Sequence, residues 1–233
     1  MKNKYQFRSR ISERLFRDIL RLFCSDICAL TAAELAGVNK NTTHQLYGRF
    51  RARVVQLTLD QSKPFTGEVE IDESYFGARR VRGKRGRGAS GKIPVVGLLK
   101  RGGCVYVKIV DDCSRDSLRP IIKGQVLTNS TVYTDGWRSY DGLVLDGYRH
   151  HRIHHHENEF ARGKNHVNGI ESFWSFAKLR MAKMRGLRKA HFLGHLLESQ
   201  WRWNHRHDNL YKVLLKNLSL NPLSEERPIA FLI

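Results

Sequence analysis

The stretch "GEVEIDESYFG", residues 67–77, alternates polar and apolar side chains and is rich in residues that favour β-structure. This pattern predicts a strand over about residues 67–75, with alternate side chains on opposite faces. Asp72 is unusual there, because it stands among the apolar strand neighbours Val69 and Ile71. A buried carboxylate is costly unless it is paired, hydrogen-bonded or bound to a metal, so Asp72 is a candidate functional residue.

The segments that follow predict an α/β domain. A hairpin of two strands, turning at residues 101–103, is predicted by "IPVVGLLKRGGCVYVKIV". A helix capped by Ser114 follows, then a short strand ending at Asp135 and a further strand in "YRHHRIHHH". Two helices are predicted over residues 168–185 and in "KAHFLGHLLESQWRWN". This order is that of a ribonuclease H-like domain, with a mixed five-stranded sheet and flanking helices.

Three carboxylates meet at one edge of such a sheet. The middle of the first strand, with Asp72, lies beside the end of the fourth strand, with Asp135. Glu171 lies in "NHVNGIESFWSFAKLR", where the neighbouring aromatics anchor a helix and Glu171 shares a face with Lys178. Three carboxylates suit Mg²⁺ or Mn²⁺, and two such ions would stabilise an in-line phosphodiester displacement. Lys178, two turns beyond Glu171, is placed to bind a DNA phosphate.

Each acid also has another interpretation. Glu73 replaces Asp72 if the strand register shifts by one residue, and Asp135 before Gly136 fits ordinary turn chemistry. Glu157 or Glu159 could replace Glu171 as the third ligand, although both lie in a predicted loop.

The N-terminal part predicts a separate helical domain over residues 1–62, with the catalytic domain and C-terminal helices over residues 63–233. A helix is predicted over residues 11–28, and Thr31 with Glu34 predicts the capped start of a short second helix. After a break at Gly37, a polar-faced helix describes a helix-turn-helix. Its side chains that can contact DNA are Lys40, Asn41, Thr42, His44, Gln45 and Arg49.

The charge of the chain favours a polyanionic partner. Lys and Arg number 41 against 22 Asp and Glu, a net charge of +19. Seven basic residues crowd a glycine-rich loop over residues 79–92, where they are expected to grip DNA phosphates: Arg79, Arg80, Arg82, Lys84, Arg85, Arg87 and Lys92. The sequence has no apolar run of membrane-spanning length and no zinc pattern around its four cysteines, so we expect a cytosolic protein without zinc or a membrane partner.

Three motifs, "EIDESYFG", "YTDGWRSY" and "HVNGIESFWSFAK", resemble those of DDE transposases from small bacterial insertion sequences. The resemblance covers about residues 65–205 and is nearest to the one-frame group, some members of which carry a zinc ribbon that is absent here. It implies that Asp72, Asp135 and Glu171 carry metal-dependent strand cleavage and strand transfer. His166 and Asn168 match the third motif, where they are candidates for a phosphate contact and a helix cap.

The resemblance also implies the partners and the reaction. The partners are double-stranded DNA, both the terminal repeats of the element and the target, near the bacterial nucleoid, with a homo-oligomer assembling on the DNA. The enzyme would nick the element ends with water and then use the 3′-hydroxyl to attack target DNA. Two alternatives stay open: a nuclease or resolvase of the same fold, and a non-catalytic DNA-binding protein derived from an element.

Overall fold

The computed structural model describes residues 3–77, 91–135, 138–153, 167–184 and 187–224. Two compact units form the chain, one of residues 62–179 and one that combines residues 1–61 with residues 180–233. Within the described ranges, no helix is long and apolar enough to cross a membrane.

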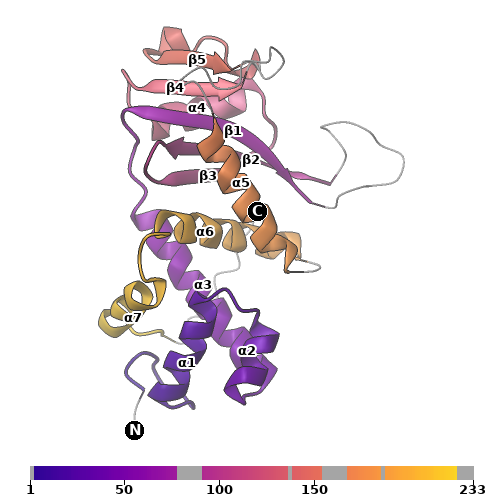
Figure 1. Ribbon diagram of the computed structural model, residues 1–233, viewed down its shortest axis with the longest axis vertical. Helices are drawn as coiled ribbons and strands as arrows, with labels where there is room; N and C mark the ends of the chain where they lie inside the picture. Colours follow the sequence, from indigo (N-terminus) through magenta and orange to yellow (C-terminus); the bar gives the residue numbers. More distant parts are fainter. Residues whose placement is uncertain (1–2, 78–90, 136–137, 154–166, 185–186, 225–233) are drawn as a thin grey trace. The chain divides into compact units, whose positions relative to one another are not determined.

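The unit of residues 62–179, the sheet unit, contains five strands in the order β3-β2-β1-β4-β5 (Figure 1). β1 pairs with β2 and β2 with β3 in antiparallel fashion, whereas β1–β4 and β4–β5 are parallel pairs. This is the mixed sheet predicted from the sequence, and its order is that of a ribonuclease H-like fold. The strands are β1 (Glu68–Phe76), β2 (Ile93–Lys100), β3 (Val105–Ile109), β4 (Thr131–Asp135) and β5 (Arg149–Ile153).

Helices cover both faces of this sheet. On one face, Leu118 and Ile122 of α4 (Arg115–Gln125) share an apolar core with Val69 and Ile71 of β1. Ser114 caps α4 as predicted, because its hydroxyl accepts a hydrogen bond from the Ser117 backbone N–H. The other face is covered by α5 (Asn168–Ala182), whose last residues belong to the second unit. Two short 3₁₀ turns, Arg138–Tyr140 and Leu143–Asp146, lie between β4 and β5.

The second unit, here the helical unit, contains α1 (Glu13–Cys24), α2 (Ala29–Ala36) and α3 (Lys40–Asp60). The second helix begins before the predicted cap, since Cys28 and not Thr31 occupies its N-cap position. Gly37 ends α2 in the left-handed conformation, with φ of 63°, and Asn39 caps α3 by accepting from the Asn41 N–H. The predicted helix-turn-helix elements are therefore present, although α3 continues to Asp60, beyond its predicted end near Val55.

The helical unit also contains α6 (Lys189–Asn204) and α7 (Leu210–Leu220), and this differs from the predicted division at residue 62. Trp201 of α6 and Leu214 and Leu218 of α7 are buried in the same apolar core as Phe16 and Ile19 of α1. The N-terminal helices thus bury their apolar faces against the end of the chain. Local periodicity gives no indication of which unit α6 joins.

A buried cluster of one glutamate and three arginines connects three helices of the helical unit. Glu198 of α6 accepts hydrogen bonds from the guanidiniums of Arg51 (2.7 Å), Arg202 (2.9 Å) and Arg180. Burial by itself raises the pKa of Glu198, but the three arginines outweigh that effect and hold its pKa well below the ordinary range. The carboxylate is therefore ionised, and it links α3, α6 and the end of α5.

Candidate active site

The register of β1 and β4 brings Asp72 and Asp135 together at the sheet edge. Ile71 pairs with Thr134 in parallel register, so each acid follows directly after a paired residue. Because side chains alternate along a strand, Asp72 lies on the opposite face from the core residue Ile71. The same alternation in β4, where Val132 is in that core, puts Asp135 on the face of Asp72. Both acids thus lie on the face that α5 covers.

The start of α5 is held on this face by a second acid of β1. Glu70 is buried, and one of its oxygens accepts a hydrogen bond of 2.9 Å from the backbone N–H of Ile170. Its other oxygen pairs with Arg101 at 2.9 Å. Gly169 makes this approach possible, since a Cβ there would lie 2.8 Å from the Glu70 carboxylate. Glu70 therefore satisfies a free N–H of the helix terminus and fixes the turn that carries Glu171.

Trp174 of α5 contacts Asp72 directly. Its indole Nε1–H donates a hydrogen bond of 3.1 Å to Asp72 Oδ2. Gly97, which pairs with Asp72 across the β1–β2 ladder, leaves room for the ring, because a Cβ at that position would lie 2.5 Å from Trp174 Cζ2. Phe76 packs edge-on against the same indole. The aromatic run after Glu171 thus anchors the helix and orients one carboxylate.

Electrostatics link the three predicted acids. The pKa of Asp72 is raised to about 6, first by burial and then by the negative charges of Asp135 and Glu171, against hydrogen bonds from the Glu73 backbone and Trp174. Electrostatic repulsion of this kind requires the acids to lie near one another. Among the described residues, no Lys or Arg forms an ion pair with Asp72.

Glu73, the alternative to Asp72, lies on the other face of β1. It accepts a hydrogen bond from the hydroxyl of Tyr140, a buried residue of the core that α4 covers. Burial raises the pKa of Glu73 to about 8, opposed by the Tyr140 hydrogen bond and reinforced by the charges of Asp72 and Asp135. A carboxyl group on that face does not share a surface with α5, so the register favours Asp72.

The remaining predicted residues of the catalytic domain, the DNA contacts and the alternative acids, lie partly on α5 and before β2 and partly outside the described residues. Lys178 is exposed on α5, with Nζ 5.9 Å from the centroid of the Phe76 ring. Asn168 is exposed and is the first residue of α5, one position inside the helix compared with the predicted cap. Lys92 lies just before β2 and is half-buried. His166, the alternatives Glu157 and Glu159, and the basic residues Arg79, Arg80, Arg82, Lys84, Arg85 and Arg87 lie outside the described residues.

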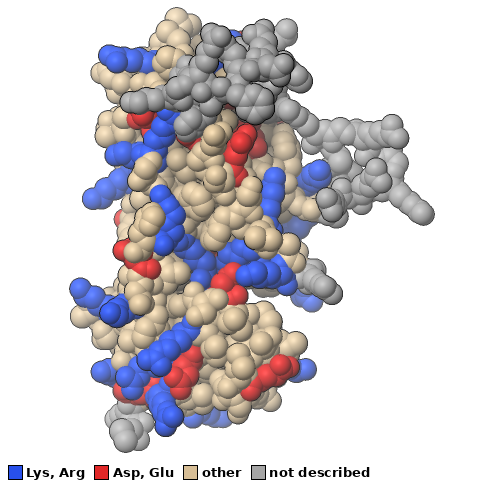
Figure 2. Space-filling model, in the orientation of Figure 1, with Lys and Arg blue, Asp and Glu red and all other residues tan. Residues whose placement is uncertain are grey.

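The predicted helix-turn-helix residues occupy the first half of α3 in the helical unit. Lys40, Asn41, His44 and Gln45 are exposed, and Thr42 and Arg49 are half-buried. Lys and Arg side chains are spread over much of the visible surface, with fewer acidic groups among them (Figure 2). The exposed side chains of α3 include the donors and acceptors that base and phosphate contacts require.

A metal ion would find oxygen ligands at the sheet edge, of the kind that Mg²⁺ and Mn²⁺ prefer. Within the described ranges, however, no three His, Cys, Asp or Glu side chains are gathered closely enough to form a ready metal site. The fit rests on the donor chemistry and on the carboxylate of Asp72, for which the described part of the chain supplies no ion-pair partner.

Sequence reasoning missed Glu70, the role of Trp174 and the Glu198 cluster. The alternation of "EVEIDESYF" was a signal for Glu70, because it puts Glu70 on the same face as Asp72. The glycines Gly97 and Gly169 were also signals, since each permits a close contact. No local signal marked Glu198, whose partners lie as far as 147 residues away along the chain.

A mixed sheet of this order with acids at the edge between β1 and β4 defines a ribonuclease H-like domain. Residues 64–204 match the family model of the ISXO2-like transposase domain. The match covers well over half of the chain, and the protein belongs to this transposase family.

Two curated relatives agree with this assignment. An uncharacterized transposase-like protein of Haemophilus influenzae is 40% identical over 114 residues, which are 49% of this chain and 92% of the relative. An uncharacterized protein in the transposable element ISH50 of Halobacterium salinarum is 34% identical over 161 residues. That match covers 62% of this chain and 55% of the relative.

Two solved structures are more distantly similar. A simian T-cell lymphotropic virus intasome, in complex with a PP2A regulatory subunit, aligns with 91% of this chain and 79% of its own at 12% identity and a TM-score of 0.40. The Mos1 transposase in a paired-end complex with the left transposon end aligns with 94% of this chain and 81% of its own, at 10% identity and a TM-score of 0.29.

Proposed function

We propose that this transposase cleaves DNA at the ends of its insertion sequence and joins the 3′-hydroxyl ends to target DNA. The proposed site consists of Asp72, Asp135 and Glu171, with Mg²⁺ or Mn²⁺ as the cofactor. The observation that carries the proposal is Asp72, a half-buried carboxylate with no ion-pair partner among the described residues, whose pKa is raised by burial first and then by the charges of Asp135 and Glu171. Membership of the transposase family supports the same reaction.

Each residue of the proposed site has a separate role in metal binding, in orienting a metal ligand or in binding DNA. The three carboxylates would hold the metal ions, which when bound neutralise charge on the attacking and leaving oxygens. Trp174 orients Asp72, and Glu70 holds the first turn of α5 and thereby Glu171. Lys178, further along the same face of α5, would bind a phosphate of the DNA strand beside the carboxylates. No covalent bond between protein and DNA is required.

Recognition of the element ends is assigned to α3. Its exposed residues Lys40, Asn41, His44 and Gln45 can reach base edges and phosphates in the major groove, as the second helix of a helix-turn-helix does. Because residues 1–61 share a core with α6 and α7, the test requires the full chain and not an N-terminal fragment. Two chains assembled on paired ends would account for cutting at both ends.

The test is an assay of cleavage and strand joining with duplexes that carry the element ends and a target plasmid. Wild-type protein with Mg²⁺ or Mn²⁺ is expected to give joined products, and Asp72→Asn, Asp135→Asn and Glu171→Gln to lose activity. The loss should exceed the roughly 10–100-fold typical of removing a residue that only supports a metal ligand. End binding should stay nearly intact in all three variants.

Glu73→Gln is the matched control, because it removes the neighbouring carboxyl group from the opposite face and should keep most of the activity. Loss of activity in Glu73→Gln, with normal activity in Asp72→Asn, would refute the proposed triad. Cleavage without joining would indicate a nuclease or resolvase. Binding without either reaction would indicate a non-catalytic DNA-binding protein.

A further inference from the structure

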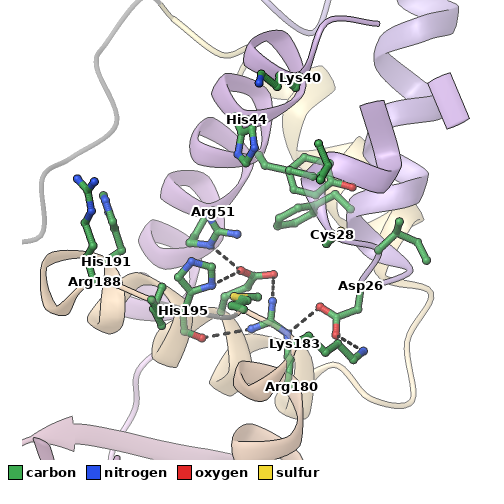
Figure 3. A pocket seen from close by; sticks show the side chains of 18 of the residues that line it. Asp26, Cys28, Lys40, His44, Arg51, Arg180, Lys183, Arg188, His191 and His195 are labelled. Carbon is green, nitrogen blue, oxygen red and sulfur yellow. Dashed lines mark hydrogen bonds and ion pairs between the residues drawn. The ribbon is translucent and has the colours of Figure 1, made fainter. Parts of the chain in front are cut away.

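The helical unit has a pocket of about 790 Å³ that none of the proposed catalytic residues enters. It is bounded by the first half of α3, the end of α5 and the start of α6 (Figure 3). Lys40 and His44 of α3 line one part of it, and Lys183, Arg188 and His191 line another. Residues from the two ends of the chain thus share one concave surface.

The charge of this pocket is positive. Its lining includes six Lys or Arg residues and two acids, Asp26 and Glu198, a formal excess of four positive charges. The inner arginines Arg51, Arg180 and Arg202 bind Glu198, while Asp26 pairs with Arg180 at 2.9 Å and with Lys183 at 3.1 Å. Glu198 thus lies among the inner arginines, whereas Asp26 also pairs with Lys183, and the exposed cations of the lining are Lys40, Lys183 and Arg188. A concave surface of one charge sign concentrates anions.

The interior of the pocket contains polar atoms without a hydrogen-bond partner among the described residues, although His195 Nδ1 lies 3.9 Å from Glu198 Oε2. Tyr47 Oη and His195 Nδ1 are buried, and neither has a hydrogen-bond partner among the described residues. Tyr47 is 5% exposed and His195 8% exposed, and both line the pocket. Buried polar groups are nearly always hydrogen-bonded in native proteins, so these atoms indicate that a polar ligand or solvent enters this space.

We propose that this pocket is a second DNA-contact surface, in which Lys183 and Arg188 bind the sugar–phosphate backbone of the duplex that α3 recognises. The inference rests on the proposed function, because it assumes that α3 docks on DNA. Lys40, Asn41 and His44 both line the pocket and form the exposed start of α3, so a duplex in contact with them passes the pocket mouth. The segment that begins at Glu171 would then serve both tasks, with Glu171 and Lys178 in catalysis and Lys183 and Arg188 in binding of the element ends.

The experiment measures DNA binding by the full chain. Fluorescent duplexes, one with the element end and one with a shuffled sequence of equal length, are titrated with wild-type protein and a double variant, Lys183→Gln with Arg188→Gln. Affinity for both duplexes should fall, and the slope of log affinity against log salt should decrease by about 0.9 for each phosphate that the variant no longer binds. The preference for the element end should persist, because α3 is unchanged.

The control variant combines Arg14→Gln with Lys212→Gln, two exposed residues of the same unit that do not line the pocket. It makes the same change in net charge and should keep the wild-type salt slope. Equal slopes in the pocket variant, the control and the wild type would overturn the inference and favour an acidic protein as the partner of this pocket. Failure of wild-type protein to bind either duplex would instead overturn the proposed function itself.

Discussion

Asp72 of the sheet unit and Glu198 of the helical unit are both carboxylates withdrawn from solvent, yet their surroundings are opposite. Glu198 is completely buried among three arginines, and its pKa is held well below the ordinary range. Asp72 accepts a hydrogen bond from Trp174, lies near two other acids, and has its pKa raised to about 6 by burial and by those acids. Glu198 is therefore surrounded by positive charge, whereas Asp72 has no ion-pair partner among the residues that the structure describes.

We interpret Glu198 as a structural group and Asp72 as a candidate functional group because of this difference. A buried carboxylate whose charge is balanced by neighbouring arginines holds helices together without a bound ligand. A carboxylate left uncompensated costs free energy in the free protein, and binding a cation recovers that cost. An acid on the sheet face that α5 covers, with no ion-pair partner among the described residues, is therefore a candidate for chemistry, and Glu198, although more deeply buried, is not.

The largest expected effect comes from removing each charge in turn. Glu198→Gln leaves three arginines without their counter-charge and should lower the free energy of unfolding by about 3–5 kcal/mol. Asp72→Asn removes a charge that burial disfavours and should leave that free energy unchanged or raise it. Urea denaturation at a pH above neutrality, without divalent metal, measures both. Equal destabilisation by the two substitutions would contradict the comparison.

The second effect concerns the hydrogen bond that Asp72 receives. Trp174→Phe retains an aromatic ring beside Gly97 but removes the indole N–H donor. The metal concentration for half-maximal cleavage should rise roughly 10–100-fold, the usual cost of losing a group that orients a metal ligand. Phe173→Leu, which changes the neighbouring packing without touching Asp72, is the control. If Trp174→Phe lowers only thermal stability and leaves the metal requirement unchanged, Trp174 is a packing residue.

The smallest effect is a pH dependence in the helical unit. Burial lowers the pKa of His195 to about 3, with Arg51, Arg180 and His191 adding to the effect and Glu198 opposing it. Because the folded pKa lies below the unfolded value, His195 contributes stability above about pH 6.5 that is lost as the pH falls. Between about pH 6.5 and pH 5 the loss should be roughly 1–2 kcal/mol.

This loss can be isolated with two glutamine substitutions. His195→Gln should flatten the dependence of the unfolding free energy on pH in that range. His207→Gln, at an exposed position of the same unit, should preserve it. Urea denaturation at several pH values gives both results, and an unchanged pH dependence in His195→Gln would show that the protonation of His195 does not differ between the folded and unfolded states.

The strands and most helices could be predicted from the sequence because their signals are local. Alternation in "GEVEIDESYFG", the Ser114 cap and the break at Gly37 depend on residues within a few positions of one another, and β1, α4 and α2 form where those signals stand. α2 begins at Ala29, before the predicted cap, and the hydroxyl of Thr31 lies inside the helix, 3.2 Å from the Cys28 thiol. Sequence alone also grouped Asp72, Asp135 and Glu171 as candidates, through strand order and motif resemblance.

Tertiary structure decided which faces and partners those residues have. The register of β1 against β4 separates Asp72 from Glu73, and it arises from pairing between segments about sixty residues apart. The docking of α5 depends on Glu70 meeting the Ile170 N–H, and the joining of α6 and α7 to the N-terminal helices depends on a shared apolar core. Each is an interaction between segments distant in the chain, and such interactions are selected by burial and hydrogen bonding in the folded state and not by local propensity.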